Sequence, residues 1–156
     1  MEYRPVEQLR DVADLHPATS LPLTRRERLE RWADVLDRDP GARLRSLGEI
    51  EFHPRTERPF MRTDGSPLTV AYADPALRAA GLRSDMLGDA IEFFDLSERQ
   101  AHALLCSCMN GWSMSADKTA ARIRRIANPD PRLRAAAWSA AIAAMLGAPA
   151  LLYLLR

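Results

Sequence analysis

The chain has 156 residues, of which 22 are Lys or Arg and 21 are Asp or Glu, so its net charge is +1. This length suits one ordinary domain, and the nearly neutral charge argues against a general nucleic-acid binder. The opening MEYRPVEQLRDVAD is charged and lacks the apolar run of a secretory signal, so we expect the two cysteines to be reduced thiols in the cytosol.

The N-terminal part predicts two helices joined by a proline-containing linker. Pro5 is suited to open a helix that runs to about Leu15, which makes residues 1–23 an N-terminal helix and linker. Thr24 and Glu27 have the spacing of a capping box for the next helix. Its apolar residues recur with the 3.6-residue period and are expected to form one buried face: Leu29, Trp32, Ala33 and Leu36.

The middle of the chain is the only stretch with strand character. A short helix is expected to end at about Leu47. In residues 49–73, apolar residues alternate with charges near the start, and LTVAY at 68–72 is rich in strand formers. Asp64-Gly65 between them is a turn signal, whereas several prolines remove ladder donors. The segment therefore predicts either one short hairpin or an extended arm.

Residues 74–127 predict four further helices, each preceded by a capping residue. The helices are expected to begin after Asp74, Ser84, Ser97 and Ser115. The third of them would run to about Met109 and the fourth to Ala127. Nine apolar residues of this stretch are expected in the core: Leu82, Leu87, Ile91, Phe93, Phe94, Leu96, Leu104, Leu105 and Ile123.

The C-terminal segment has two interpretations. Residues 135–155 carry no charged side chain, and an apolar helix of ~20 residues spans a bilayer. Its strong apolar residues supply about −2 to −3.5 kcal/mol for insertion, so the favourable term is small. Alternatively, Asp130 and Pro131 begin a soluble core helix that stops at Gly147 and Pro149.

Arginines before this segment favour the membrane interpretation, because positive residues beside a span stay in the cytosol and attract anionic lipid. Small residues at helical spacing suit close helix contact, and Trp and Tyr suit the membrane interface. The residues expected to face a membrane or partner are Arg122, Arg125, Arg132, Arg134, Trp138, Ala140, Ala144 and Tyr153.

His102, Cys106 and Cys108 are the one cluster of ligand types in the sequence. On a straight helix His102 and Cys106 share a face, but Cys108 lies about 160° from Cys106 at ~100° per residue. A shared metal would require the helix to end at Cys106 and another ligand, His53 or His16, to join. The sequence therefore leaves His102 and Cys106 as weak candidates and assigns no metal, no cofactor and no catalytic residue.

These features together predict a mainly α protein. It would comprise the linker region 1–23, a multi-helix domain at 24–128 with an arm at 49–73, and an apolar helix at 129–156. The expected function is a non-enzymatic accessory or assembly subunit of a membrane protein complex. Its tail would lie in the inner (cytoplasmic) membrane and its N-terminal domain in the cytosol. The alternative is a soluble cytoplasmic interaction or regulatory domain with the tail in its core.

Overall fold

The computed structural model describes residues 22–129, which form a mainly helical domain, as expected. The expected helix at 5–15 and the apolar segment 130–156 lie outside these residues. Among the helices of residues 22–129, none is long and apolar enough to cross a bilayer. In chain order the described elements are α2 (Arg25–Leu36), β1 (Arg43–Arg45), η1 (Ile50–Phe52), η2 (Arg58–Phe60), α3 (Pro67–Ala73), α4 (Pro75–Ala79), α5 (Leu87–Phe94), α6 (Glu98–Leu105), α7 (Ser107–Asn110), β2 (Ser113–Ser115) and α8 (Ala116–Ala127).

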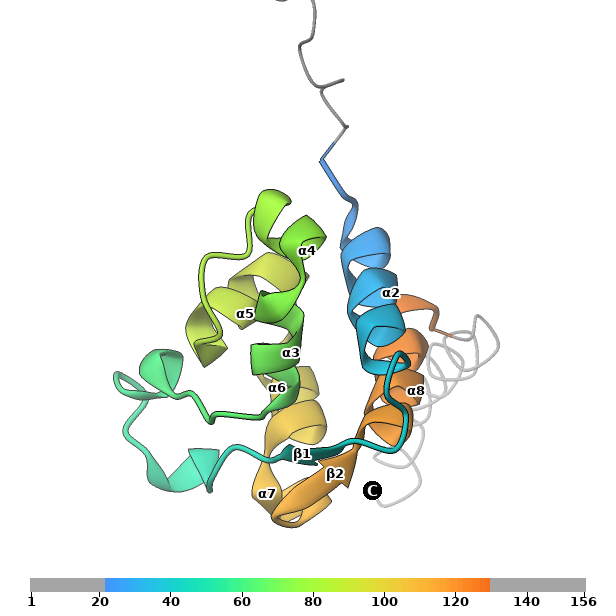
Figure 1. Cartoon of the computed structure of the whole chain (residues 1–156). Coiled ribbons are helices and arrows are strands. Elements are labelled where there is room, and N and C mark those ends of the chain that lie inside the picture. The colour runs from blue at the N-terminus through green and yellow to red at the C-terminus, as the bar shows by residue number, and fades with distance from the viewer. Residues whose placement is uncertain (1–21, 130–156) are drawn as a thin grey trace, which may run out of the picture.

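The predicted capping box at the start of α2 is confirmed. The Glu27 N–H donates to Thr24 Oγ1 at 3.3 Å, and the Thr24 N–H donates to Glu27 Oε2 at 2.7 Å. The predicted face of Leu29, Trp32, Ala33 and Leu36 is buried. Figure 1 shows α2 lying along α8, with α3 to α6 on the other side of α2.

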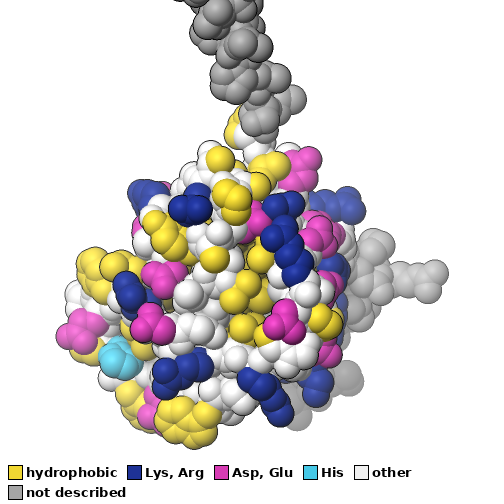
Figure 2. Space-filling view, viewed as in Figure 1, with side chains coloured by type: hydrophobic (Ala, Val, Ile, Leu, Met, Phe, Trp, Pro, Cys, Tyr) yellow, Lys and Arg dark blue, Asp and Glu magenta, His cyan; other side chains and the backbone are white. Residues whose placement is uncertain are grey.

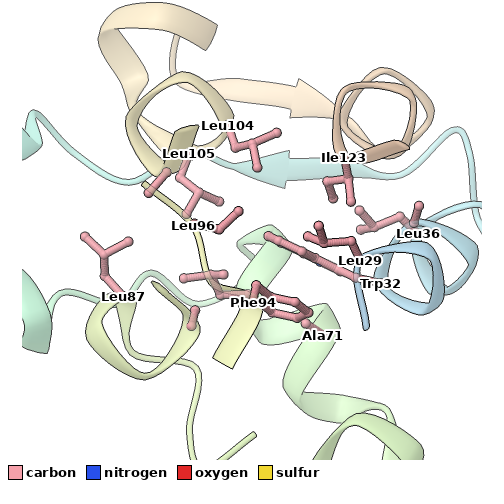
Figure 3. Close-up of a cluster of buried hydrophobic side chains, with 14 of the residues drawn as sticks. Leu29, Trp32, Leu36, Ala71, Leu87, Phe94, Leu96, Leu104, Leu105 and Ile123 are labelled. Atoms are coloured by element: carbon pink, nitrogen blue, oxygen red, sulfur yellow. The ribbon is translucent and has the colours of Figure 1, made fainter. Parts of the chain in front are cut away.

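The core is centred on Trp32 and Phe94, whose rings stack with centroids 4.4 Å apart. Figure 3 shows side chains from α2, α5, α6 and α8 pointing toward this pair. The Trp32 indole N–H donates to the Pro67 carbonyl at 3.0 Å, so its one polar group is satisfied although the residue is fully buried. Eight of the nine residues predicted for the core in 74–127 are buried, and Ile91 is half-buried.

The helix expected to end at Leu47 is wrong, because Arg43–Arg45 forms strand β1. Leu44 is buried while the arginines on either side are exposed, which is the two-residue period of a strand with one covered face. β1 pairs antiparallel with β2, and Leu44 lies opposite Met114. The partner strand is some 70 residues along the chain, so the local sequence contains no sign of it.

No hairpin forms in residues 49–73, because the strand-rich LTVAY segment lies in helix α3. Ser66 accepts a hydrogen bond from the Thr69 N–H at 3.3 Å, and Pro67 stands at the first helical position. This start signal outweighs the strand propensity of Thr69, Val70 and Tyr72, which is a weak and context-dependent preference. The arm therefore comprises residues 49–66 and contains the two 3₁₀ turns η1 and η2.

Helix α5 holds the arm at a close approach to Gly88. Asp74 caps α4 as predicted, but α5 begins at Leu87 rather than directly after Ser84. A Cβ atom on Gly88 would lie 2.7 Å from Cβ of Pro59, which belongs to η2. Glycine at this position therefore lets the arm lie directly against α5.

Candidate metal centre

The helix expected to run from Ser97 to about Met109 is shorter than predicted. Its capping box of Ser97 and Gln100 is confirmed, but α6 ends at Leu105 and a separate short helix, α7, starts at Ser107. Cys106 lies between them in an extended conformation, with φ −72° and ψ 140°. The straight helix that would separate the two cysteines is therefore absent.

A contact from the segment after β1 accounts for this break. Leu47 forms an isolated parallel bridge with Cys106, in which its N–H donates to the Leu105 carbonyl at 2.8 Å. Its carbonyl accepts from the Ser107 N–H at 2.9 Å. In a continuous helix the Ser107 N–H would bond to the Ala103 carbonyl instead. The Leu47 carbonyl therefore accepts the hydrogen bond of the Ser107 N–H, which a continuous α6 would have needed for its next turn.

Asn110 satisfies the carbonyls that the break leaves without helical partners. Its side-chain amide donates to the Ala103 carbonyl at 3.3 Å and to the Cys106 carbonyl at 2.9 Å. Arg122 of α8 contacts the amide oxygen of Asn110. Since buried or half-buried carbonyls need donors, Asn110 holds the two-helix turn in shape.

The break brings four potential metal ligands together: Glu51, His102, Cys106 and Cys108. Their ligand atoms all lie within 4.8 Å of one another. They make a closed ring of contacts. Glu51 Oε2 lies 3.0 Å from His102 Nε2 and 3.4 Å from Cys106 Sγ. Cys108 Sγ lies 2.9 Å from Cys106 Sγ and 3.5 Å from His102 Nε2.

Two separate parts of the chain supply this cluster. Glu51 comes from η1 in the arm, and the other three groups come from α6 and the turn into α7. Cys106 is fully buried, whereas the side chains of His102 and Glu51 are 37% and 40% exposed. The cluster therefore has one buried ligand and an open side at the protein surface.

The geometry fits a tetrahedral ion. Zinc binds sulfur at ~2.3 Å and nitrogen or oxygen at ~2.0–2.2 Å, which places neighbouring ligand atoms roughly 3.3–3.8 Å apart. Three of the four ring contacts, at 3.0 to 3.5 Å, lie within a few tenths of an ångström of this spacing. The two sulfur atoms, at 2.9 Å, would have to move apart by nearly an ångström to bind one ion.

The charges of the cluster also favour a cation. A hydrogen bond from His102 lowers the pKa of Glu51 to about 2. The hydrogen bond with Cys106, followed by burial, raises the pKa of the Cys108 thiol to about 12. Without a cation the cluster therefore holds an ionised carboxylate beside a protonated thiol at neutral pH. A divalent ion reverses this preference, because thiols bind metals as thiolates and release their protons.

Sequence reasoning missed Glu51 as a member of this cluster, and it set Cys108 aside unless the helix ended at Cys106, which it does. Only a tertiary contact, the Leu47 bridge, ends α6 early enough to bring Cys108 round to Cys106. His53, which was considered as an additional ligand, is exposed and lies outside the group of four, and Glu51 takes that position. His16 lies outside the described residues.

The two described residues expected to face a membrane or partner differ in their surroundings. Arg122 is half-buried and directed at Asn110, whereas Arg125 is exposed on α8. The arginine of this helix that pairs most extensively is Arg124, which contacts Asp34 and Asp37 of α2 at 2.8 Å and 2.5 Å. The other expected positions lie outside the described residues: Arg132, Arg134, Trp138, Ala140, Ala144 and Tyr153.

Comparison of the chain with protein-family models, with curated proteins and with solved structures found no match.

Proposed function

We propose that this chain is a zinc-binding protein in which one ion, held by Glu51, His102, Cys106 and Cys108, joins the arm to the turn between α6 and α7. The observation that carries the proposal is the closed ring of contacts among four side chains of ligand type. Four protein ligands leave no open position on a tetrahedral ion, which is typical of a structural site.

The ligand types select the metal. Two thiolates and an imidazole are soft or borderline ligands, which zinc accepts and which magnesium and calcium do not favour. Zinc also has no preferred geometry of its own, so it tolerates the mixed sulfur, nitrogen and oxygen set. Glu51 is the one ligand of the four that comes from the arm, where it belongs to the 3₁₀ turn η1. The ion would thus tie a surface segment to the helical core.

Metal analysis of protein purified without a histidine tag tests the proposal. We expect one zinc per chain, and Co²⁺ substitution should produce a thiolate-to-cobalt absorption band. Replacing Cys106 and Cys108 by serine should reduce zinc affinity by more than ~100-fold, since loss of outer-shell partners alone costs ~10- to 100-fold. His102→Ala should weaken binding similarly.

His53→Ala is the matched control, because His53 is the other histidine of the described residues and lies two positions from Glu51. This variant should keep its zinc. Background metal content in the native protein after reconstitution with zinc under reducing conditions would contradict the proposal. Equal losses in His102→Ala and His53→Ala would contradict the assignment of the ligands.

A second role, that of an accessory subunit which binds other proteins, is favoured by large hydrophobic side chains at the surface. Phe52, Phe60 and Trp112 are 76%, 70% and 79% exposed. Figure 2 shows hydrophobic side chains gathered over the arm. Aromatic residues are enriched in protein interfaces, so these positions suit partner contact. The membrane location of that role rests on residues 135–155, outside the described residues, and remains a proposal from the sequence.

Fractionation of cells tests the membrane location. Full-length protein should pellet with membranes and resist carbonate extraction. Ala143→Arg should move it to the soluble fraction, because one central charge costs about 2.5 to 3.5 kcal/mol, as much as the whole favourable term. Leu133→Ala, outside the uncharged stretch, is the control and should leave the protein in the membrane. A well-behaved soluble parent without detergent would exclude the anchor.

A further inference from the structure

A pocket of about 570 Å³ lies between the arm, α5 and α6, beside the proposed metal centre. Ile50, Leu87, Ile91 and Ala101 contribute apolar side chains to its walls. Leu87 and Ala101 belong to the buried core, so helices rather than loops form this part of the surface. The volume falls within the ~300–1,000 Å³ range of pockets that bind small molecules.

The pocket presents an excess of positive charge. Three arginines line it: Arg55 and Arg58 from the arm and Arg99 from α6. Arg58 is partly committed, since it donates to the His53 and Glu51 carbonyls at 3.0 Å and 3.2 Å. Arg55 and Arg99 are exposed and stand on opposite elements. The guanidinium group is suited to carboxylates because its planar fork donates two parallel hydrogen bonds.

The acidic groups in the pocket do not cancel this charge. The carboxylate of Glu51 makes its hydrogen bonds with His102 and Cys106 and not with the arginines of the pocket. Glu98 is then the remaining carboxylate against the two uncommitted guanidinium groups, those of Arg55 and Arg99. A pocket lined by apolar side chains and by arginines is complementary to an amphiphilic anion, whose chain and head group have different requirements.

We propose that this pocket binds a small organic anion, namely a carboxylate on an unbranched apolar chain. The chain lies against Leu87, Ile91 and Ala101, and the carboxylate pairs with Arg55 and Arg99. This inference goes beyond metal binding and does not depend on it. Glu51 and His102 contribute to both sites, so the ligand lies next to the proposed ion without needing to coordinate it.

Calorimetric titration of the full-length protein with octanoate tests the proposal. Octanoate should bind at one site, and hexanoate, which is two methylenes shorter, should bind about 15-fold more weakly, since each buried methylene strengthens binding roughly fourfold. Octylammonium, which has the same chain and the opposite charge, should not bind measurably. The double variant Arg55→Gln, Arg99→Gln should lose at least tenfold in octanoate affinity.

The double variant Arg26→Gln, Arg43→Gln is the matched control, because both residues are exposed and neither lines the pocket. It should bind octanoate as the native protein does. Absence of octanoate binding at millimolar concentration would overturn the proposal. Equal affinity for hexanoate and octanoate, or equal losses in the two double variants, would also overturn it. Zinc content is measured on the same samples, so that a failure to bind zinc can be distinguished from a failure to bind octanoate.

Discussion

Removing the zinc ion should destabilise the full-length protein by about 4 kcal/mol, the value expected when free metal stands near 1,000 times its dissociation constant. The arm should be released before the helical core unfolds. Its attachments include the contact of Pro59 with Gly88 and the Glu51 cluster. The core of Trp32 and Phe94 lies among the helices and does not depend on the ion.

Urea unfolding with and without a strong chelator measures the first effect, and limited trypsin digestion measures the second. Arg55 is exposed in the arm, so cleavage after Arg55 should accelerate at least tenfold on chelation. Cleavage after Arg31, which lies in α2 and pairs with the buried Asp74, is the internal reference. In Glu51→Gln the arm is already detached from the ion, and chelation should add little to its cleavage. If chelation left the rate of cleavage after Arg55 unchanged in the native protein, the metal would not hold the arm in place.

Sequence reasoning succeeded where the structure depends on nearby residues. The capping boxes at Thr24 and Ser97 each join side chain and backbone within four residues, and both are present. The buried face of α2 follows from its period alone. Such signals are local, so a single sequence contains them.

The errors occurred where a distant segment decides the local conformation. Arg43–Arg45 is a strand because Ser113–Ser115 pairs with it. Helix α6 stops because Leu47 takes the Ser107 N–H, and neither proline nor glycine marks the site. The LTVAY error is different in kind, since Ser66 and Pro67 are a local start signal that strand propensity concealed.

The same break in α6 explains why the sequence did not reveal the full ligand set of the candidate site. With α6 continued to Met109, Cys108 and Cys106 diverge, and the cluster is reduced to two ligands. With the break, Cys108 returns to Cys106 and Glu51 joins from a segment about fifty residues earlier, a separation that residue spacing in one sequence does not reveal. Ligand types therefore indicated the correct region, whereas the ligand set required the tertiary structure.

Asp74 is the buried charge on which the helical layer depends most. Its side chain is fully buried and accepts from Arg31 Nη2 at 2.8 Å and Nε at 3.2 Å. It also caps α4 by accepting from the Ala76 and Leu77 N–H groups at 3.0 Å and 3.1 Å. Burial by itself would raise the pKa of Asp74, but these hydrogen bonds and the Arg31 charge outweigh it and leave the pKa lowered.

Asp74→Ala should lower the free energy of unfolding by about 2 to 3 kcal/mol, since it leaves the helix cap unmade, with the buried Leu77 N–H and the Arg31 charge without their acceptor. Asp74→Asn keeps a good capping oxygen and should cost about half as much.

Because the pKa of Asp74 in the folded protein lies below its ordinary value of 3.8, the contribution of the Asp74 charge is present at neutral pH. It is lost as the pH falls below that value and through the folded pKa. The stability difference between native protein and Asp74→Asn, measured by urea unfolding, should therefore shrink as the pH falls into the acid range below about pH 5. Asp64→Ala is the control, because the Asp64 side chain is 81% exposed and its pair with Arg62 contributes only about 0–1 kcal/mol. A difference that stays constant into acid would show that Asp74 stabilises the fold by its shape and capping rather than by its charge.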